Sequence, residues 1–117
     1  MITRKQGVYL RFFVHENRRH HGILLYEWRL EQAKKLGIHG GTAFRSIAGF
    51  GRHGVLREQH FFELAGDLTV RVDFVITFEE ADRLLKLIEA ENLSLFFAEL
   101  PAEFGLAGGA VTQDKLP

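Results

Sequence analysis

The residues best suited to chemistry are cations set among glycines in residues 40–54, GGTAFRSIAGFGRHG. Glycine in or just after a strand often marks a bulge or a close approach of the backbone to a ligand or another chain. The pattern favours a flexible basic arm that recognises an anion or a partner; the alternative is a twisted hairpin with solvated charges. The candidate ligand-binding residues of this stretch are Arg45, Gly49, Phe50, Gly51 and Arg52.

A second group of cations lies in the polar loop of residues 15–22, HENRRHHG. Arginine forms forked hydrogen bonds to phosphate and carboxylate oxygens, so such a loop can bind an anion. A solvated connection whose histidines titrate without consequence is the alternative. The candidate ligand-binding residues here are Arg18, Arg19, His21 and Gly22, with His20 beside them.

The six histidines raise the question of a metal, but their spacing predicts no metal site. No two of them stand four residues apart on a helix, and the adjacent His20 and His21 should point apart in an extended chain. Cysteine is absent, which removes thiolate ligands and fits a reducing cytoplasm. No nucleophile elbow and no recognisable Ser-His-Asp spacing are present. We therefore expect no catalytic residues and a protein that is not an enzyme.

Composition predicts one globular domain of 117 residues, since 46% of the chain is apolar and 11 residues are Phe. Residues 1–60 hold 11 Lys or Arg and 4 Asp or Glu, and residues 61–117 hold 4 and 11, so the halves carry +7 and −7. This asymmetry fits a basic anion-binding patch, or complementary surfaces within an oligomer, and the overall balance disfavours nucleic-acid binding. No apolar run could span a bilayer or serve as a secretory signal, which predicts a cytoplasmic protein without membrane insertion.

Periodicity predicts four strands and two helices. Alternating apolar residues indicate strands at 7–14 and 68–76, and a Thr77–Glu80 capping box opens the second helix. Pro101 is expected to end the last strand, leaving residues 102–117 without a regular pattern. In order, the elements are a strand at 7–14, a helix at 23–36, a strand at 42–50, an ambiguous stretch at 55–64, a strand at 68–76, a helix at 78–92 and a strand at 93–100.

This order predicts an α+β, ferredoxin-like βαββαβ sandwich with two helices on one face of an antiparallel sheet. The expected inner face of the sheet includes Leu10 and Phe12. Apolar side chains are also expected on the uncovered face, at Tyr9, Phe13 and Phe96. Because a solvated face is usually polar, we expect a further subunit to cover it.

Two motifs in this order resemble the nitrogen-regulatory PII superfamily, and more closely its PII-like members grouped as domain of unknown function 190. Residues 21–26, HGILLY, are similar to the group's HGxPLY, with Leu24 where Pro is usual. Residues 41–51, GTAFRSIAGFG, are similar to its ATxxRGxxGFG, with Ser46 in place of a Gly. The run 68–80 resembles the group's third strand and the start of its second helix, and the likeness covers about residues 8–100.

The resemblance implies a homotrimer with inward-facing sheets and an adenine nucleotide in the cleft between subunits. AMP, ADP and ATP are the candidate effectors, and no cofactor is required. It also implies a flexible loop, here residues 51–60, that changes shape with the ligand and docks on a target, such as a membrane transporter or a metabolic enzyme. The domain would span residues 1–101 and a C-terminal extension residues 102–117.

Two other functions stay open for this architecture, and two more are disfavoured. A purely structural oligomer would need no ligand, and the related copper-tolerance proteins suggest a metal-binding trimer. Acylphosphatases share the fold, but their phosphate loop and Asn partner are not recognisable here. The strand motifs of RNA-binding ferredoxin-like domains are also absent.

Overall fold

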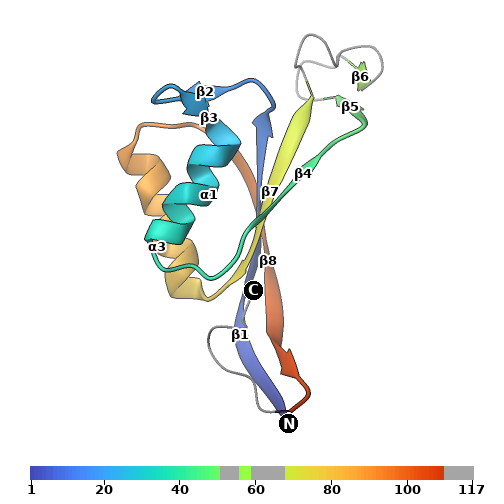
Figure 1. Cartoon of the computed structure of the whole chain (residues 1–117), viewed down its shortest axis with the longest axis vertical. Coiled ribbons are helices and arrows are strands. Elements are labelled where there is room, and N and C mark those ends of the chain that lie inside the picture. Colours follow the sequence, from blue (N-terminus) through green and yellow to red (C-terminus); the bar gives the residue numbers. More distant parts are fainter. Residues whose placement is uncertain (51–55, 59–67, 110–117) are drawn as a thin grey trace.

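A four-stranded antiparallel sheet carries the fold in a computed structural model that describes residues 1–50, 56–58 and 68–109. The strand order is β4-β7-β1-β8, and both helices lie on the same face of the sheet (Figure 1). The predicted ferredoxin-like βαββαβ arrangement is confirmed. The bounds are β1 Ile2–His15, α1 Leu25–Lys35, β4 Thr42–Arg45, β7 Thr69–Ile76, α3 Phe78–Ala90 and β8 Phe96–Ala107.

Two short ribbons stand apart from the main sheet at the same end of the molecule (Figure 1). In one, β2 (Arg19–His20) pairs with β3 (Ile23–Leu24), and in the other β5 (Ala48–Phe50) pairs with β6 (Leu56–Glu58). The second ribbon occupies part of the predicted basic arm. The rest of the predicted docking loop, 51–55 and 59–60, lies outside the described residues, as do residues 110–117 of the tail.

The core lies between the helices and the inner face of the sheet, as the period-2 pattern predicted. The alternating apolar residues of β1 and β7 are buried, and Phe12 packs edge-on against Phe74 with ring centroids 6.2 Å apart. The helices add apolar side chains to the same cluster. The buried set includes Val8, Leu10, Phe12, Val14, Val70, Val72, Phe74, Ile76, Leu25, Trp28, Ala33, Ala81, Leu84 and Ile88.

The capping box at the start of α3 is confirmed. The Thr77 hydroxyl accepts a hydrogen bond from the Glu80 backbone N–H at 3.2 Å, and a Glu80 carboxylate oxygen accepts from the Thr77 N–H at 2.9 Å. Two N–H groups that the helix itself cannot satisfy are thus paired. Within the described ranges, neither helix is long and apolar enough to cross a bilayer.

The prediction that Pro101 ends the last strand is wrong. Strand β8 continues to Ala107, and β1 begins at Ile2 because the two strands pair over their whole length, with Ile2 opposite Ala107. A proline, which lacks a backbone N–H, is tolerated in β8 because this strand lies at the edge of the sheet formed by the described residues, where a nitrogen that faces away from β1 needs no pairing. Gly7 is required where the long ribbon leaves the core, since a Cβ there would collide with the Ile76 carbonyl and the Phe104 ring.

The predicted strand at 42–50 is divided into β4 and β5. The break falls at Ser46, whose backbone N–H donates to the Thr69 carbonyl at 2.9 Å and whose hydroxyl accepts from the Thr69 N–H at 3.2 Å. These two bonds hold the end of β4 against the start of β7. The chain then departs from the main sheet as the β5–β6 ribbon.

The face of the sheet away from the helices combines exposed apolar side chains with a buried carboxylate. Phe13 and Phe96 contact each other edge-on at 5.5 Å, and both are exposed. Asp73 lies on this face, but it is only 5% exposed. It accepts hydrogen bonds from the Tyr9 hydroxyl and the Arg71 Nε, both at 2.9 Å, which compensate the burial of its charge.

Arg29 of α1 is a fully buried cation on the helix face, at 0% exposure. Its guanidinium carbon lies 3.5 Å from the centre of the Phe12 ring, and none of its three nitrogens has a hydrogen-bond partner within the described part of the chain. Desolvation by burial lowers the pKa of Arg29 from its ordinary value to about 9. The attraction between cation and ring offsets only part of the cost of burying an unpaired charge.

We predict that Arg29→Met raises the free energy of unfolding by about 1 kcal/mol or more at pH 7, because a buried apolar side chain replaces an unpaired charge. The pKa of Arg29 is lower in the folded than in the unfolded state, so above about pH 9 the unfolded chain binds more protons than the folded one. The free energy of unfolding of the parent therefore rises as the pH increases above about 9. The advantage of the variant is thus full below about pH 9 and shrinks above it. Urea unfolding at pH 7 and pH 10 measures both effects.

The matched control is Arg83→Met on the exposed side of α3. It removes the same charge without relieving any burial, so its stability should stay near that of the parent at both pH values. A loss of stability in Arg29→Met would show that the buried guanidinium is net stabilising.

Candidate functional site

A tight turn at His21 and Gly22 shapes the basic loop. Both residues have positive φ, 52° and 82°, and they join β2 to β3 as a two-residue hairpin. Hairpins of this length favour turns with positive φ at both central positions, and Gly adopts this conformation without a steric cost. Helix α1 therefore begins at Leu25, and not at residue 23 as predicted, because Ile23 and Leu24 belong to the ribbon.

The side chains of Arg18 and Arg19 each donate a hydrogen bond to a backbone carbonyl. Arg18 Nη1 donates to the Ser94 carbonyl at 3.1 Å, which fixes the loop to the segment after α3. Arg19 Nη1 donates to the Gly22 carbonyl at 3.1 Å across the turn. A guanidinium has five N–H donors, so both side chains retain capacity for an anion.

Arg45 lies at the end of β4 and forms an ion pair with Glu16, with 2.6 Å between Nη2 and Oε1. Glu16 directly follows β1, and its backbone N–H donates to the Leu68 carbonyl at 2.7 Å. The pair therefore links the end of β1 to the point where the chain leaves the sheet toward β5. At 38% exposure the Arg45 side chain is accessible to solvent.

The structure places the predicted ligand-binding residues in two groups at one end of the molecule (Figure 1). Arg18, Arg19, His21 and Gly22 belong to the β2–β3 ribbon, beside the helices. Arg45 marks the start of the other group, with the backbone of Gly49 and Phe50 in β5. The predicted site residues Gly51 and Arg52 lie outside the described residues.

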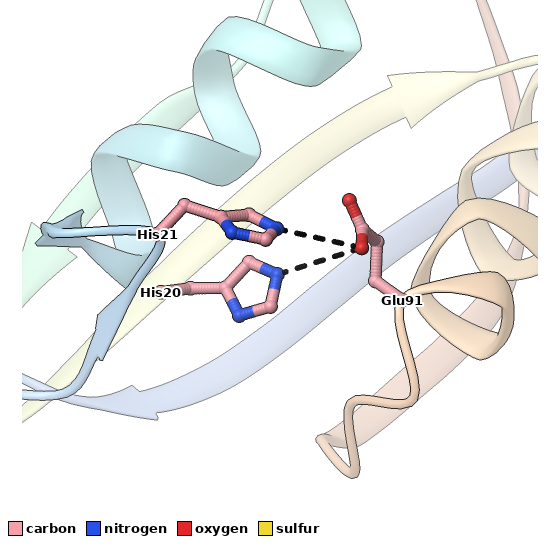
Figure 2. A group of neighbouring side chains, drawn as sticks. All are labelled: His20, His21 and Glu91. Atoms are coloured by element: carbon pink, nitrogen blue, oxygen red, sulfur yellow. Dashed lines mark ion pairs between the residues drawn. The ribbon is translucent and has the colours of Figure 1, made fainter.

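The side chains of His20 and His21 both turn toward Glu91 (Figure 2). Their Nε2 atoms lie 3.9 and 3.5 Å from the same carboxylate oxygen, Oε2, and their ring centroids are 4.1 Å apart. The expectation that adjacent histidines point apart is wrong here. It assumed an extended chain, whereas His21 has left-handed backbone geometry, which brings both rings to one side.

Glu91 owes its position to the way α3 ends. Asn92 has φ 56°, and the Leu93 N–H donates back to the Ile88 carbonyl at 3.1 Å, a Schellman-type end. The Asn after Glu91 is a sequence signal for this helix end. Nothing in the local pattern connects Glu91 to two histidines 70 residues earlier, so sequence reasoning missed it.

The fold is that of the PII-like proteins. The structure of CPII, a nitrogen regulatory PII-like protein from Thiomonas intermedia K12, superposes with a TM-score of 0.67, covering 91% of this chain and 94% of that one. The two sequences are 18% identical, so the likeness concerns the fold. CPII was solved bound to ADP, AMP and bicarbonate.

Sequence comparison defines the family within this class. The family model of DUF190, described as "Uncharacterized ACR", matches residues 7–94. A UPF0166 protein of Aquifex aeolicus is 34% identical over 90 residues, 77% of this chain and 86% of that protein. Another, from Methanocaldococcus jannaschii, is 33% identical over 81 residues, 68% of this chain and 74% of that protein. The chain belongs to the DUF190 family, which confirms the resemblance seen in its motifs.

We predict that Gly22→Ala destabilises the protein by about 1 kcal/mol, because a Cβ is strained at positive φ even though the space around it is open. His21→Asn should be close to neutral, since Asn tolerates the left-handed conformation. Thermal unfolding of the two variants beside the parent measures the difference. Equal melting temperatures for Gly22→Ala and the parent would mean that the turn changes its backbone at little cost.

Proposed function

We propose that this protein is a non-enzymatic PII-like regulator that binds an adenine nucleotide between the subunits of a homotrimer. The effector is AMP, ADP or ATP, alone or with a small anion. Binding changes the β5–β6 arm and the loop it carries, and the arm acts on a partner such as a membrane transporter or a metabolic enzyme. This function places the protein in the cytoplasm.

The observation that carries the proposal is the position of the cationic donors relative to the arm. The segments that carry Arg18 and Arg19, and the end of β4 that carries Arg45, lie at the end of the sheet from which the β5–β6 ribbon departs (Figure 1). Arginine suits the planar oxygens of phosphate and carboxylate. An anion bound there would act directly on the base of the arm, as a ligand-dependent switch requires.

The PII-like fold supports the choice of ligand. CPII, which has this fold, is described with ADP, AMP and bicarbonate, all of which are anions. Adenine nucleotides also have an aromatic base, which requires an apolar surface. In a trimer, that surface would come from two neighbouring chains.

The outer face of the sheet supports a trimer. Its exposed apolar residues form a surface of the kind that subunit interfaces cover. The Asp73 carboxylate already accepts hydrogen bonds from Tyr9 and Arg71, so burying this face does not leave that carboxylate unpaired. The exposed apolar residues of this face are Phe13, Phe44, Val75, Phe96 and Leu100.

We predict that the double variant Phe13→Glu/Phe96→Glu is monomeric, because two carboxylates would be buried in the subunit interface. Analytical ultracentrifugation should give the mass of three chains for the parent and of one chain for the variant. The control is Phe78→Glu, which alters a Phe at the start of α3 whose exposure lies between those of Phe13 and Phe96, and it should stay trimeric. A parent that sediments as a monomer would contradict the proposal.

We predict that AMP, ADP or ATP raises the melting temperature by several degrees in chelator-treated protein. A ligand at 100 times its Kd adds about 2.7 kcal/mol to the folded state. Arg45→Ala should lose most of this shift while the trimer persists. Glu16→Gln removes only the charge opposite Arg45. If Arg45 contacts the nucleotide, the nucleotide should raise the melting temperature of this variant by as much as that of the parent, or by more.

The pair of variants separates binding from structure. If Arg45 serves only its ion pair with Glu16, both variants lose the shift equally, and Arg45 has no role in the ligand site. A flat response of the parent to every adenine nucleotide would favour a structural oligomer.

A further inference from the structure

Two imidazoles and one carboxylate converge at the junction between the β2–β3 turn and the end of α3. One ligand atom each from His20, His21 and Glu91 lies within 4.8 Å of the other two. Figure 2 shows both rings presenting a nitrogen to the same carboxylate oxygen. Among the described residues this is the one such group with metal-ligating chemistry.

The contacts inside this cluster leave one of its buried polar atoms unsatisfied. The Nε2 of His20 is buried and has no hydrogen-bond partner among the residues that the structure describes. Its distance to Glu91 Oε2, 3.9 Å, is too long for a hydrogen bond, and the 3.5 Å from His21 is at the limit. A buried polar atom without a hydrogen-bond partner costs free energy, so a ligand that bonds to this nitrogen would stabilise the folded protein.

Two of the three ligand-atom distances are close to those around a bound metal ion, and the third is no more than 4.8 Å. Ligand bonds of about 2.1 Å at a tetrahedral angle separate neighbouring ligand atoms by about 3.4 Å. The 3.5 and 3.9 Å found here need only small side-chain movements to reach that value. Two imidazoles and one carboxylate are also a ligand set that proteins use for zinc with an open coordination position.

The surroundings hold the ligands in place and favour a cation. The His20 ring packs edge-on against the buried Trp28 ring at 4.6 Å, which restricts its rotation. Glu91 caps the carboxyl end of α3, where the helix dipole is negative, and the last turn has no basic residue. His21 is 63% exposed and Glu91 33%, so solvent can reach the open side of the site.

From this geometry we propose that His20, His21 and Glu91 bind a divalent transition-metal ion of the zinc type. Imidazole ligands suit Zn²⁺, Cu²⁺, Ni²⁺ and Fe²⁺, whereas Mg²⁺ and Ca²⁺ require oxygen ligands. The ion joins the β2–β3 turn to the end of α3, two segments that are distant in sequence. Water completes its coordination on the exposed side.

The experiment measures zinc binding to the full-length protein, prepared without a histidine tag, stripped with chelator and free of nucleotide. Isothermal titration with Zn²⁺ should give one ion per chain, and zinc should raise the melting temperature in a saturable way. Titration with Co²⁺ should produce visible absorption bands from the bound ion. Magnesium at the same concentration should have no effect.

The ligand variants are Glu91→Gln and His21→Asn, each of which should weaken zinc binding by at least about tenfold. The matched controls are Glu89→Gln, on the exposed side of the same helix, and His15→Gln at the end of β1. Both controls should bind zinc within about twofold of the parent, since neither touches the cluster. Absence of zinc binding, or equal binding by Glu91→Gln and the parent, would overturn the proposal.

The nucleotide measurement above is made in chelator, so the two proposals fail separately. A protein that binds zinc but no nucleotide keeps the metal site and loses the regulator function. A protein that binds nucleotide but no zinc supports the regulator function and contradicts the metal site.

Discussion

The structure depends on the antiparallel pairing of β1 with a strand on each side. Its register with β7 sets Leu10 opposite Phe74, and its register with β8 sets Phe12 opposite Phe97. A shift of one residue in either pairing would turn the apolar face of β1 away from the helices. Phe12 is the centre of this arrangement, since it contacts Phe74, Phe97 and the Arg29 guanidinium.

The pairing of β1 also determines where the two groups of basic residues lie. The strand ends at His15, and within a few residues the chain supplies Glu16 to Arg45 and Arg18 to the Ser94 carbonyl. Both basic groups are therefore built from the same end of one strand. A central strand is a rigid base for such loops, because its hydrogen bonds on both sides limit its movement.

Two departures from the family's motifs have simple structural explanations. Leu24 stands where Pro is usual, and its φ of −61° is the value that a proline ring imposes, so the backbone keeps the same path. Ser46 stands where Gly is usual, at a position without positive φ, and its hydroxyl adds a bond to the Thr69 N–H.

The fold class, the inner faces of β1 and β7, the capping box of α3 and the likeness to the family could be predicted from the amino-acid sequence. The strand faces and the cap follow from spacings of two to four residues, and the fold class and the family follow from the order of the elements and two motifs, all of which a linear pattern records directly. Three features emerge only in the folded chain: β8 passes Pro101, Arg45 meets Glu16, and Glu91 meets His20 and His21. Those contacts join segments distant in the chain, and they depend on strand register and on the positive φ of His21 and Asn92. No local spacing encodes such positions, because the sheet and the ends of its helices must form before these side chains can meet.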